Sequence, residues 1–260
     1  MKFTGERERL FGLKGMTALV TGASSGIGEH SARLFARAGC HVVLTARRLS
    51  KVQSIASELQ SNGADAIGLE LDVNCRDSVE TTVSEVIAQL GSVDILLNNA
   101  GIANPERFLD MSEKQWGDVI DTDLSGVWRV AQVAARQMIK QDSGGSMINV
   151  ASVLGLAVQR RQANYIAAKS AVIQLTKSMA LELGDKGVRV NAIAPGYFMT
   201  DINRDFLTSE VGKNYIRGLV PRRAGNLVEL DGALLLLAGS AGSYIQGSVI
   251  TVDGGTLLAG

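Results

Sequence analysis

The chain has 260 residues, with 26 Lys and Arg against 26 Asp and Glu, so its formal net charge is zero, and 46% of its residues are hydrophobic. This apolar content excludes an intrinsically disordered chain, and the neutral balance argues against a nucleic-acid-binding protein, which would carry a basic stripe. No apolar run approaches the ~18–20 residues that a membrane span needs, and the N-terminal segment lacks the apolar core of a signal peptide. The two cysteines, Cys40 and Cys75, exclude a disulfide framework, suit a reducing compartment and are expected to pack in the core. We therefore expect a cytoplasmic globular protein without membrane or nucleic-acid partners.

Short runs rich in Val, Ile and Leu recur along the chain and predict strands. Most are apolar throughout, which is typical of strands covered on both faces of a parallel sheet. Helical spacing of apolar residues fills the segments between them, so the alternation favours right-handed βαβ units in a doubly wound α/β sheet. No linker or repeat interrupts this pattern, and we predict one Rossmann-type domain over residues 1–260. The seven expected strands are 17–22, 41–46, 66–73, 93–101, 146–152, 188–196 and 248–255, and the expected helices are 27–38, 52–60, 78–90, 116–140, 165–183 and 228–238.

A glycine-rich turn, TGASSGIG at residues 21–28, joins the first expected strand to the first expected helix. Glycine lets the backbone turn tightly and approach a pyrophosphate, whose charge the N–H groups at the helix start can face. The position of the turn, directly after an apolar strand, predicts a dinucleotide site. Its expected contacts are Gly22, Ser24, Ser25, Gly26, Ile27 and Gly28.

The end of the second expected strand selects the nucleotide. A carboxylate there would bind a ribose 2′-hydroxyl, whereas a basic residue would accept a 2′-phosphate. This strand ends at Ala46 and runs into Arg47 and Arg48, with no acidic residue. The sequence therefore favours NADP(H) over NAD(H).

A tyrosine and a lysine, Tyr165 and Lys169, stand four residues apart in a segment of helical character. This spacing places both on one helix face, where a cation favours the phenolate and lowers a tyrosine pKa that starts near ~10. Tyr165 would then act as a general acid/base toward a carbonyl oxygen. Ser152 closes an expected strand shortly before this helix.

With these residues in place, the sequence resembles the short-chain dehydrogenase/reductase family from about residue 15 to residue 255. The resemblance includes TGASSGIG, LDV at 71–73, NNAG at 98–101, Ser152, YIAAK at 165–169, APG at 194–196 and VDGG at 252–255. The two ends of the chain look like members of the gluconate 5-dehydrogenase type or the 3-oxoacyl-carrier-protein reductase type. The resemblance implies an NADP(H)-dependent oxidoreductase that interconverts a ketone and a secondary alcohol, and a homotetramer or homodimer.

Carried over by position, the resemblance also implies roles for the site residues. Ser152 would hydrogen-bond the substrate carbonyl, Tyr165 would donate or accept the proton, and Lys169 would bind the nicotinamide ribose and lower the pKa of Tyr165. The other expected cofactor contacts are Asp72 and Val73 at the adenine, Asn99, Ala100 and Gly101 at its ribose, and Pro195, Gly196, Phe198 and Thr200 at the nicotinamide.

One position departs from the family pattern. Asp123 stands where the family usually places an asparagine that anchors a water of the proton relay. An aspartate keeps the shape but adds a negative charge and loses an N–H donor. We expect the relay to survive with a changed pH–rate profile.

The substrate region is less determined by the sequence. Substrate contacts are expected from 102–107, from 154–162 and from a lid segment, residues 197–223, whose Tyr197, Phe206 and Tyr215 either cover the substrate or fill a small core. Arg160 and Arg161 either recognise an acidic substrate or lie in solvent or at a subunit contact.

No cluster with metal-ligand spacing surrounds His30 or His41, so no metal is expected. Two alternatives stay open, a binding-only NADP(H) sensor and a lyase or epimerase on the same scaffold.

Overall fold

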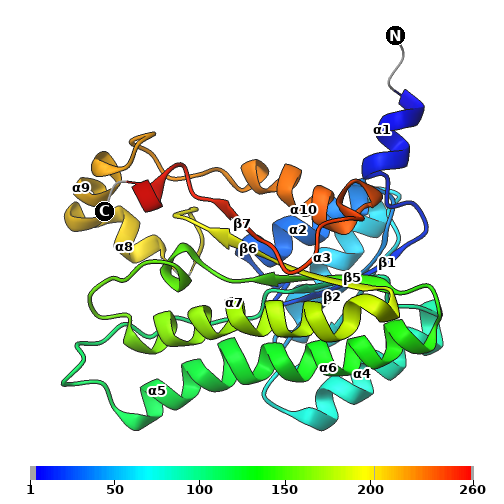
Figure 1. Ribbon diagram of the computed structural model, residues 1–260, viewed down its shortest axis with the longest axis horizontal. Coiled ribbons are helices and arrows are strands. Elements are labelled where there is room, and N and C mark those ends of the chain that lie inside the picture. The colour runs from blue at the N-terminus through cyan, green and yellow to red at the C-terminus, as the bar shows by residue number, and fades with distance from the viewer. Residues whose placement is uncertain (1–3, 202, 259–260) are drawn as a thin grey trace.

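The computed structural model describes residues 4–201 and 203–258, and in them seven parallel strands form one sheet (Figure 1). The strand order is β3-β2-β1-β4-β5-β6-β7, so the expected parallel α/β sheet is confirmed. The strands are β1 (Thr17–Thr21), β2 (His41–Ala46), β3 (Ala66–Glu70), β4 (Ile95–Asn98), β5 (Gly145–Val150), β6 (Val188–Pro195) and β7 (Val249–Val252).

Helices cover both faces of the sheet (Figure 1). One face carries α2, α3 and α10, and the other carries α4, α6 and α7. The helices are α1 (Thr4–Phe11), α2 (Gly26–Arg37), α3 (Leu49–Ser61), α4 (Arg76–Leu90), α5 (Glu113–Ile120), α6 (Gly126–Lys140), α7 (Ala163–Leu183), α8 (Arg204–Thr208), α9 (Glu210–Gly218) and α10 (Asp231–Ala238). Of these, α1, α8 and α9 were not among the expected helices.

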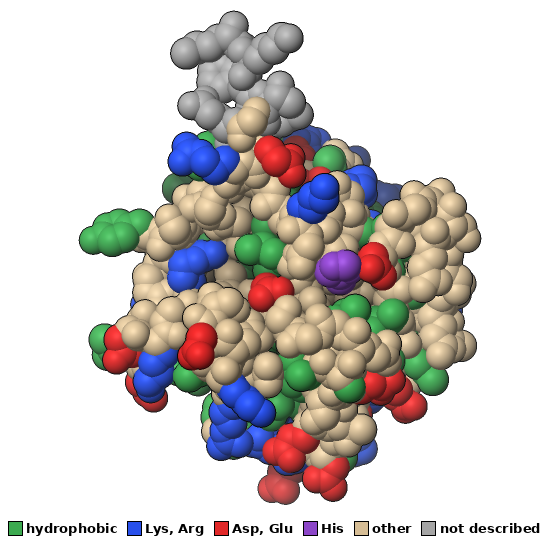
Figure 2. Space-filling view, turned by 90° about the vertical axis from the view of Figure 1, so that its right-hand side faces the viewer, with side chains coloured by type: hydrophobic (Ala, Val, Ile, Leu, Met, Phe, Trp, Pro, Cys, Tyr) green, Lys and Arg blue, Asp and Glu red, His purple; other side chains and the backbone are tan. Residues whose placement is uncertain are grey.

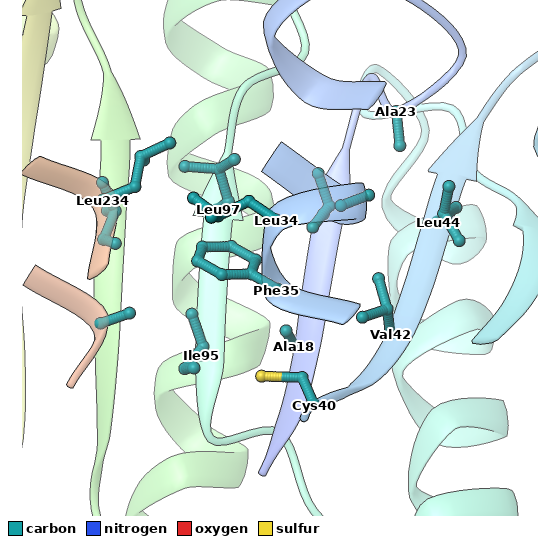
Figure 3. Packing of buried hydrophobic residues seen from close by; sticks show 14 of the residues in the cluster. Ala18, Ala23, Leu34, Phe35, Cys40, Val42, Leu44, Ile95, Leu97 and Leu234 are labelled. Atoms are coloured by element: carbon teal, nitrogen blue, oxygen red, sulfur yellow. The ribbon is translucent and has the colours of Figure 1, made fainter. Parts of the chain in front are cut away.

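Each central strand supplies two hydrophobic cores because its successive side chains point to opposite faces. In β1, Ala18 and Val20 join the core beneath α2, whereas Leu19 joins the core beneath α4 and α6. Figure 3 shows Phe35 of α2 lying against Ile95 and Leu97 of β4 in the first core. Full burial of each such side chain contributes about 1.5–3 kcal/mol, so the two cores fix the central strands firmly.

The order of the strands reverses at β1, which pairs with β2 on one side and β4 on the other. The chain leaves β1 toward β2 and β3, and later returns to the other side of β1 as β4. At such a switch point the loops after neighbouring strands diverge and leave a crevice at the carboxyl ends. The sheet therefore places a binding cleft after β1 and β4.

The single long helix expected at 116–140 is interrupted. A π-helical turn over Asp121–Ser125 separates α5 from α6 and contains the buried Asp123. Such turns widen a helix locally and occur frequently at functional sites. Trp116 and Trp128 on these helices are 43% and 42% exposed, so they lie outside the core, and their role in subunit packing stays a prediction.

Basic and acidic side chains lie interspersed over the face shown in Figure 2, in keeping with the zero net charge. Both histidines pair with carboxylates, His30 with Asp231 and His41 with Asp65, each at 2.6 Å. Within 4–201 and 203–258, no three His, Cys, Asp or Glu side chains gather as metal ligands would. None of the helices described there has the length and apolar character to cross a bilayer.

The cysteines have different environments. Cys40 is buried in the core beneath α2, as expected, whereas Cys75 is exposed just before α4. The prediction that both cysteines pack in the core is therefore wrong for Cys75, which stands at the exposed start of a helix.

Candidate active site

A cleft of about 490 Å³ lies at the carboxyl ends of the central strands and is large enough for a cofactor-sized ligand. It brings together every residue that the sequence assigned to the site except Gly28, which is buried in α2 and does not line the cleft. The assigned residues that line it are Gly22, Ser24, Ser25, Gly26, Ile27, Arg47, Arg48, Asp72, Val73, Asn99, Ala100, Gly101, Asp123, Ser152, Tyr165, Lys169, Pro195, Gly196, Phe198 and Thr200.

The glycine-rich turn forms one end of the cleft. Gly22 and Gly26 have φ angles of 64° and 59°, a conformation that side chains disfavour. A Cβ at Gly22 would lie 2.8 Å from the Ala100 Cα, and a Cβ at Gly28 would overlap the Gly22 carbonyl oxygen and the Asn99 amide. The glycines are therefore needed where the turn, the helix start and the end of β4 approach one another.

The start of α2 faces the cleft with free backbone donors. Ser25 is the N-cap residue, and its side chain makes no capping hydrogen bond. The N–H groups of the first helical turn are then available for an anion, and the helix dipole favours one there. Beside this turn, Arg48 Nη2 donates to Ser24 Oγ at 2.8 Å, which places a guanidinium next to the turn and beside Arg47.

Asn99 holds the ends of β1 and β4 together at the floor of the cleft. Its side-chain amide donates to the carbonyl oxygens of Thr21 and Gly22 at 3.0 and 3.2 Å. The backbone N–H groups of Asn99 and Ala100 both donate to Thr21 Oγ1, at 2.9 and 3.0 Å. At the adjoining wall, Asp72 Oδ1 accepts from the backbone N–H of Asn74 at 2.9 Å, and the Asp72 N–H donates to Ser78 Oγ at 3.0 Å.

Ser152, Tyr165 and Lys169 converge on the opposite part of the cleft. Ser152 follows β5, is 8% exposed, and its hydroxyl accepts from the Leu154 N–H at 3.1 Å. One turn apart on α7, Lys169 Nζ lies 5.5 Å from the centre of the Tyr165 ring. Lys169 is 3% exposed and donates to the Val150 carbonyl oxygen at 3.0 Å.

The start of α7 is fixed by Asn164, which sequence reasoning did not single out. Asn164 is fully buried, and its amide donates to the carbonyl oxygens of Asn104 and Gln115 at 3.2 and 3.0 Å. These bonds tie the helix that carries Tyr165 to the loop after β4 and to α5. Asparagines are common in turns, so nothing local in the sequence separates this one from others.

Asp123 reaches the same centre from the π-helical turn. Its Oδ2 lies 3.2 Å from Lys169 Nζ, and its Oδ1 accepts from the Ile102 N–H at 2.8 Å. Asp123 is fully buried, and this burial raises its pKa against the opposing charge of Lys169. For Lys169, burial acts to lower the pKa, but Asp123 and Tyr165 outweigh it, so the pKa lies above its ordinary value.

Lys169 acts to lower the pKa of Tyr165, as expected, but a larger effect opposes it. Burial raises the pKa of Tyr165; Lys169 opposes this rise, and the Asp123 charge adds to it. The net direction is upward because burial is the largest of these effects, and the Asp123 charge adds to it. Tyr165 therefore holds its proton more firmly here than the tyrosine–lysine pair by itself indicated.

A short segment after β6 closes the far side of the cleft. Asn203 organises it, since its Nδ2 donates to the Phe198 carbonyl oxygen at 2.7 Å and its Oδ1 accepts from the Thr200 N–H at 3.0 Å. Asn203 and Asp201 also line the cleft, although the sequence pattern did not mark them. A Cβ at Gly26 would lie 3.4 Å from Thr200, so this segment lies directly against the glycine-rich turn.

Taken together, the cleft fits a dinucleotide, with glycines that leave room at its phosphate end and free N–H groups beside them. At the other end, a hydroxyl, a phenol and a buried ammonium converge, which suits proton transfer to an oxygen atom. The two ends share one continuous cavity, so a bound nucleotide and a carbonyl group could meet there.

Comparisons with known proteins show which family the chain is similar to. Residues 16–210 match the family model described as short chain dehydrogenase. The 3-oxoacyl-acyl-carrier-protein reductase FabG of Staphylococcus aureus is 39% identical over 240 residues, which are 92% of this chain and 97% of that protein. The reductase of the same name from Chlamydia muridarum is 37% identical over 239 residues, 92% of this chain and 96% of that protein.

Solved structures are similar over nearly the whole length. A gluconate 5-dehydrogenase from Burkholderia cenocepacia, in complex with NADP and tartrate, superposes with a TM-score of 0.93 at 34% identity, covering 96% of this chain and 98% of that one. A short-chain type dehydrogenase/reductase from Mycobacterium marinum has a TM-score of 0.91 at 37% identity, covering 95% and 97%.

Proposed function

This chain belongs to the short-chain dehydrogenase/reductase family of NAD(P)-dependent oxidoreductases that act on CH–OH and carbonyl groups, and from that premise we propose its reaction. It interconverts a small-molecule ketone and a secondary alcohol, with NADP(H) as cofactor and Tyr165 as general acid/base. The observation that carries the proposal is the convergence of Ser152, Tyr165 and Lys169 on the cleft that the glycine-rich turn begins.

A bound nicotinamide would supply the hydride that adds to the carbonyl carbon. Ser152 would donate a hydrogen bond to the carbonyl oxygen and orient it toward Tyr165. As the hydride arrives, the Tyr165 hydroxyl would give its proton to that oxygen, and Lys169 would stabilise the phenolate left behind. Lys169 is held for this role between Val150, Asp123 and the Tyr165 ring.

The preference for NADP(H) rests on the two arginines after β2. Arg48 is held beside the glycine-rich turn by Ser24, and Arg47 lines the same wall, where a ribose 2′-phosphate would sit. A planar guanidinium binds a phosphate with two parallel hydrogen bonds, which strongly favours the phosphorylated cofactor. Among the similar structures, the Burkholderia enzyme holds NADP.

The test is a paired titration of the protein with NADPH and NADH, followed by nicotinamide fluorescence. We expect NADPH to bind at least about tenfold more tightly, a difference of about 1.4 kcal/mol. Arg48→Ala should weaken the binding of NADPH and leave the binding of NADH unchanged. Arg136 is an exposed arginine of α6 outside the cleft, so Arg136→Ala should change the affinity for neither nucleotide. Tighter binding of NADH would contradict the assignment of the arginines.

Turnover is measured in the same samples with a panel of ketones, β-keto esters and keto-sugars. Reduction of any of them, with stoichiometric loss of nicotinamide absorbance and abolished in Tyr165→Phe, supports the oxidoreductase. Cofactor binding without turnover across the panel would support the binding-only sensor instead. Assembly as a homotetramer and a cytoplasmic location stay predictions.

A further inference from the structure

The helix α7 carries both Tyr165 and Lys169, but these two residues are held in place by different contacts. Near Lys169, the helix is fixed to the segment after β5. Ser170 Oγ donates to the Gly155 carbonyl oxygen at 3.1 Å, and a Cβ at Gly155 would lie 2.8 Å from the Lys169 carbonyl oxygen. Lys169 Nζ also donates to the Val150 carbonyl oxygen. Lys169 is therefore held independently of the first turn of the helix.

The first turn of α7, which contains Tyr165, is not held by an N-cap side chain. Gln162 is the N-cap residue, and its side chain makes no capping hydrogen bond within the described chain. The first N–H groups of a helix have no partner inside the helix, so another acceptor is needed. Asn164 supplies one, because its Oδ1 accepts from the Tyr165 N–H at 2.8 Å. The backbone of Tyr165 is thus tied directly to this side chain.

The Asn164 amide also fixes this turn to two other segments. Its Nδ2 donates to the carbonyl oxygens of Asn104 and Gln115, so the start of α7 lies against the loop after β4 and against α5 (Figure 1). Asn164 is fully buried, and both its nitrogen and its oxygen are paired. A buried polar side chain with all of these bonds is held rigidly, so it fixes Tyr165 relative to both segments.

The entry into the helix depends on the same loop. Arg161, three residues before Asn164, has a φ angle of 68°, in the left-handed region that side chains disfavour. Such conformations persist only where the surrounding structure holds them. The Arg161 carbonyl oxygen accepts from the Glu106 N–H at 2.9 Å, and the Asn164 amide reaches Asn104 on this loop as well. The loop after β4 therefore holds the start of α7 at two points.

Asp123 is bound to this loop too. The Ile102 N–H donates to Asp123 Oδ1, and Asp123 Oδ2 lies 3.2 Å from Lys169 Nζ. Two residues after Ile102, the Asn104 carbonyl oxygen accepts from Asn164. These contacts form a closed ring, which runs from the loop through Asp123 and Lys169 to α7 and returns through Asn164. Asn164 closes the ring on the side of the phenol, so its loss would free the phenol and leave Lys169 held.

We propose that Asn164 is a positioning residue for proton transfer, which holds the Tyr165 hydroxyl where a carbonyl oxygen bound to Ser152 can take its proton. The proposal rests on the ketone reduction proposed above and assigns it one further residue. Asn164 is not among the described residues that line the cleft, so it acts through Tyr165. A displacement of about 1 Å at a reacting group can cost about a hundredfold in rate. Loss of Asn164 should therefore slow the reaction without weakening nucleotide binding.

The test compares Asn164→Ala with the wild-type protein in the reduction of a ketone of the panel by NADPH. We expect kcat to fall about a hundredfold. The Kd of NADPH, measured by fluorescence titration, should stay unchanged, because Lys169 and the glycine-rich turn keep their contacts. Proton transfer then limits the rate, so the solvent deuterium isotope effect on kcat should be larger than in the wild-type protein.

Asn191→Ala is the matched control. Asn191 is as fully buried as Asn164, its Nδ2 donates to the Ile245 carbonyl oxygen, and its Oδ1 accepts from the Ser248 N–H, both at 2.9 Å. Asn191 lies on β6 and is not among the described residues that line the cleft. Asn191→Ala should therefore lower the Tm as Asn164→Ala does, but leave kcat and the isotope effect unchanged. If Asn164→Ala does not fold, Asn164→Ser takes its place, and its kcat should still fall at least about fivefold.

The outcomes separate the role of Asn164 from the reaction itself. A kcat in Asn164→Ala equal to that of Asn191→Ala would overturn the positioning role and leave the ketone reduction standing. A lowered kcat with an unchanged isotope effect, or with an equal loss of NADPH affinity, would place the damage outside proton transfer and would also overturn it. Turnover that survives in Tyr165→Phe, or no turnover of any ketone by the wild-type protein, would overturn both proposals.

Discussion

Replacing Asp123 by asparagine changes one charge at the catalytic centre and leaves its shape almost intact. The asparagine keeps an oxygen that can accept from the Ile102 N–H, now 2.8 Å from Oδ1. What disappears is the negative charge 3.2 Å from Lys169 Nζ. Lys169 then acts on Tyr165 without a compensating anion, and the pKa of Tyr165 falls.

The size of the effect follows from the distances. A unit charge on Lys169 Nζ, 5.5 Å from the Tyr165 ring, is worth about 3 kcal/mol at an effective dielectric constant of ~20. Asp123 Oδ2 is 3.2 Å from Lys169 Nζ and therefore at most ~9 Å from the ring centre, so its charge opposes this by about 2 kcal/mol at the same dielectric constant. Its removal should raise the ratio of phenolate to phenol at least about tenfold at a given pH.

The assay is the pH profile of kcat/KM in both directions. Alcohol oxidation needs deprotonated Tyr165, so its acid limb should move to lower pH by at least about one unit in Asp123→Asn. Ketone reduction needs the protonated form, so its basic limb should also move to lower pH. Asp121→Asn, on the same π-helical turn but exposed, is the control and should change neither. An unshifted profile in Asp123→Asn would show that the carboxyl group carries no charge, and would refute the reasoning.

Two further predictions concern the glycine-rich turn and the thiols. Gly28→Ala should weaken NADPH binding by at least about tenfold, because a displacement of ~1 Å at such a site costs much of its function. Gly232→Ala, in α10 where a Cβ meets no atom within 4 Å, should leave the affinity unchanged, and equal affinities for the two variants by fluorescence titration would contradict the close packing. A thiol reagent at pH 8 should modify one cysteine per chain rapidly, because Cys75 is exposed and burial raises the pKa of the Cys40 thiol to about 12. Cys75→Ser should abolish this fast phase; a fast reaction that survives in that variant would place Cys40 within reach of solvent.

The sheet and the phosphate end of the cleft were predictable because their signals are local. An apolar strand, a glycine-rich turn and a helix follow one another in residues 17–37, and the physics of each lies within that segment. The residues lining the cleft largely coincide with those that the sequence assigned, since strand ends of a doubly wound sheet meet at one edge. Binding of a cofactor by these residues stays a prediction.

The remaining features depend on contacts between distant segments. Asn164, Asn203 and the Tyr197–Gln159 hydrogen bond join loops that only the fold brings together. The π-helical turn could not be predicted from the sequence either. Residues 116–140 have helical periodicity throughout, and a turn that is wider by one residue hardly changes that periodicity. Cys75 is likewise exposed at the N-cap of α4, which the apolar strand before it did not indicate.

The direction of the Tyr165 pKa shift could not be predicted from the sequence pattern. A tyrosine and a lysine at i and i+4 predict a lowered pKa, but burial of Tyr165 raises it by more, and Asp123, 46 residues from the lysine in sequence, adds to the rise. Aspartate is tolerated there because Oδ1 still satisfies the Ile102 N–H while Oδ2 meets the ammonium, so both buried charges are paired. Burial, with the Asp123 charge adding to it, raises the pKa of Tyr165, so the phenol stays protonated at neutral pH, which is the state that the proposed ketone reduction needs.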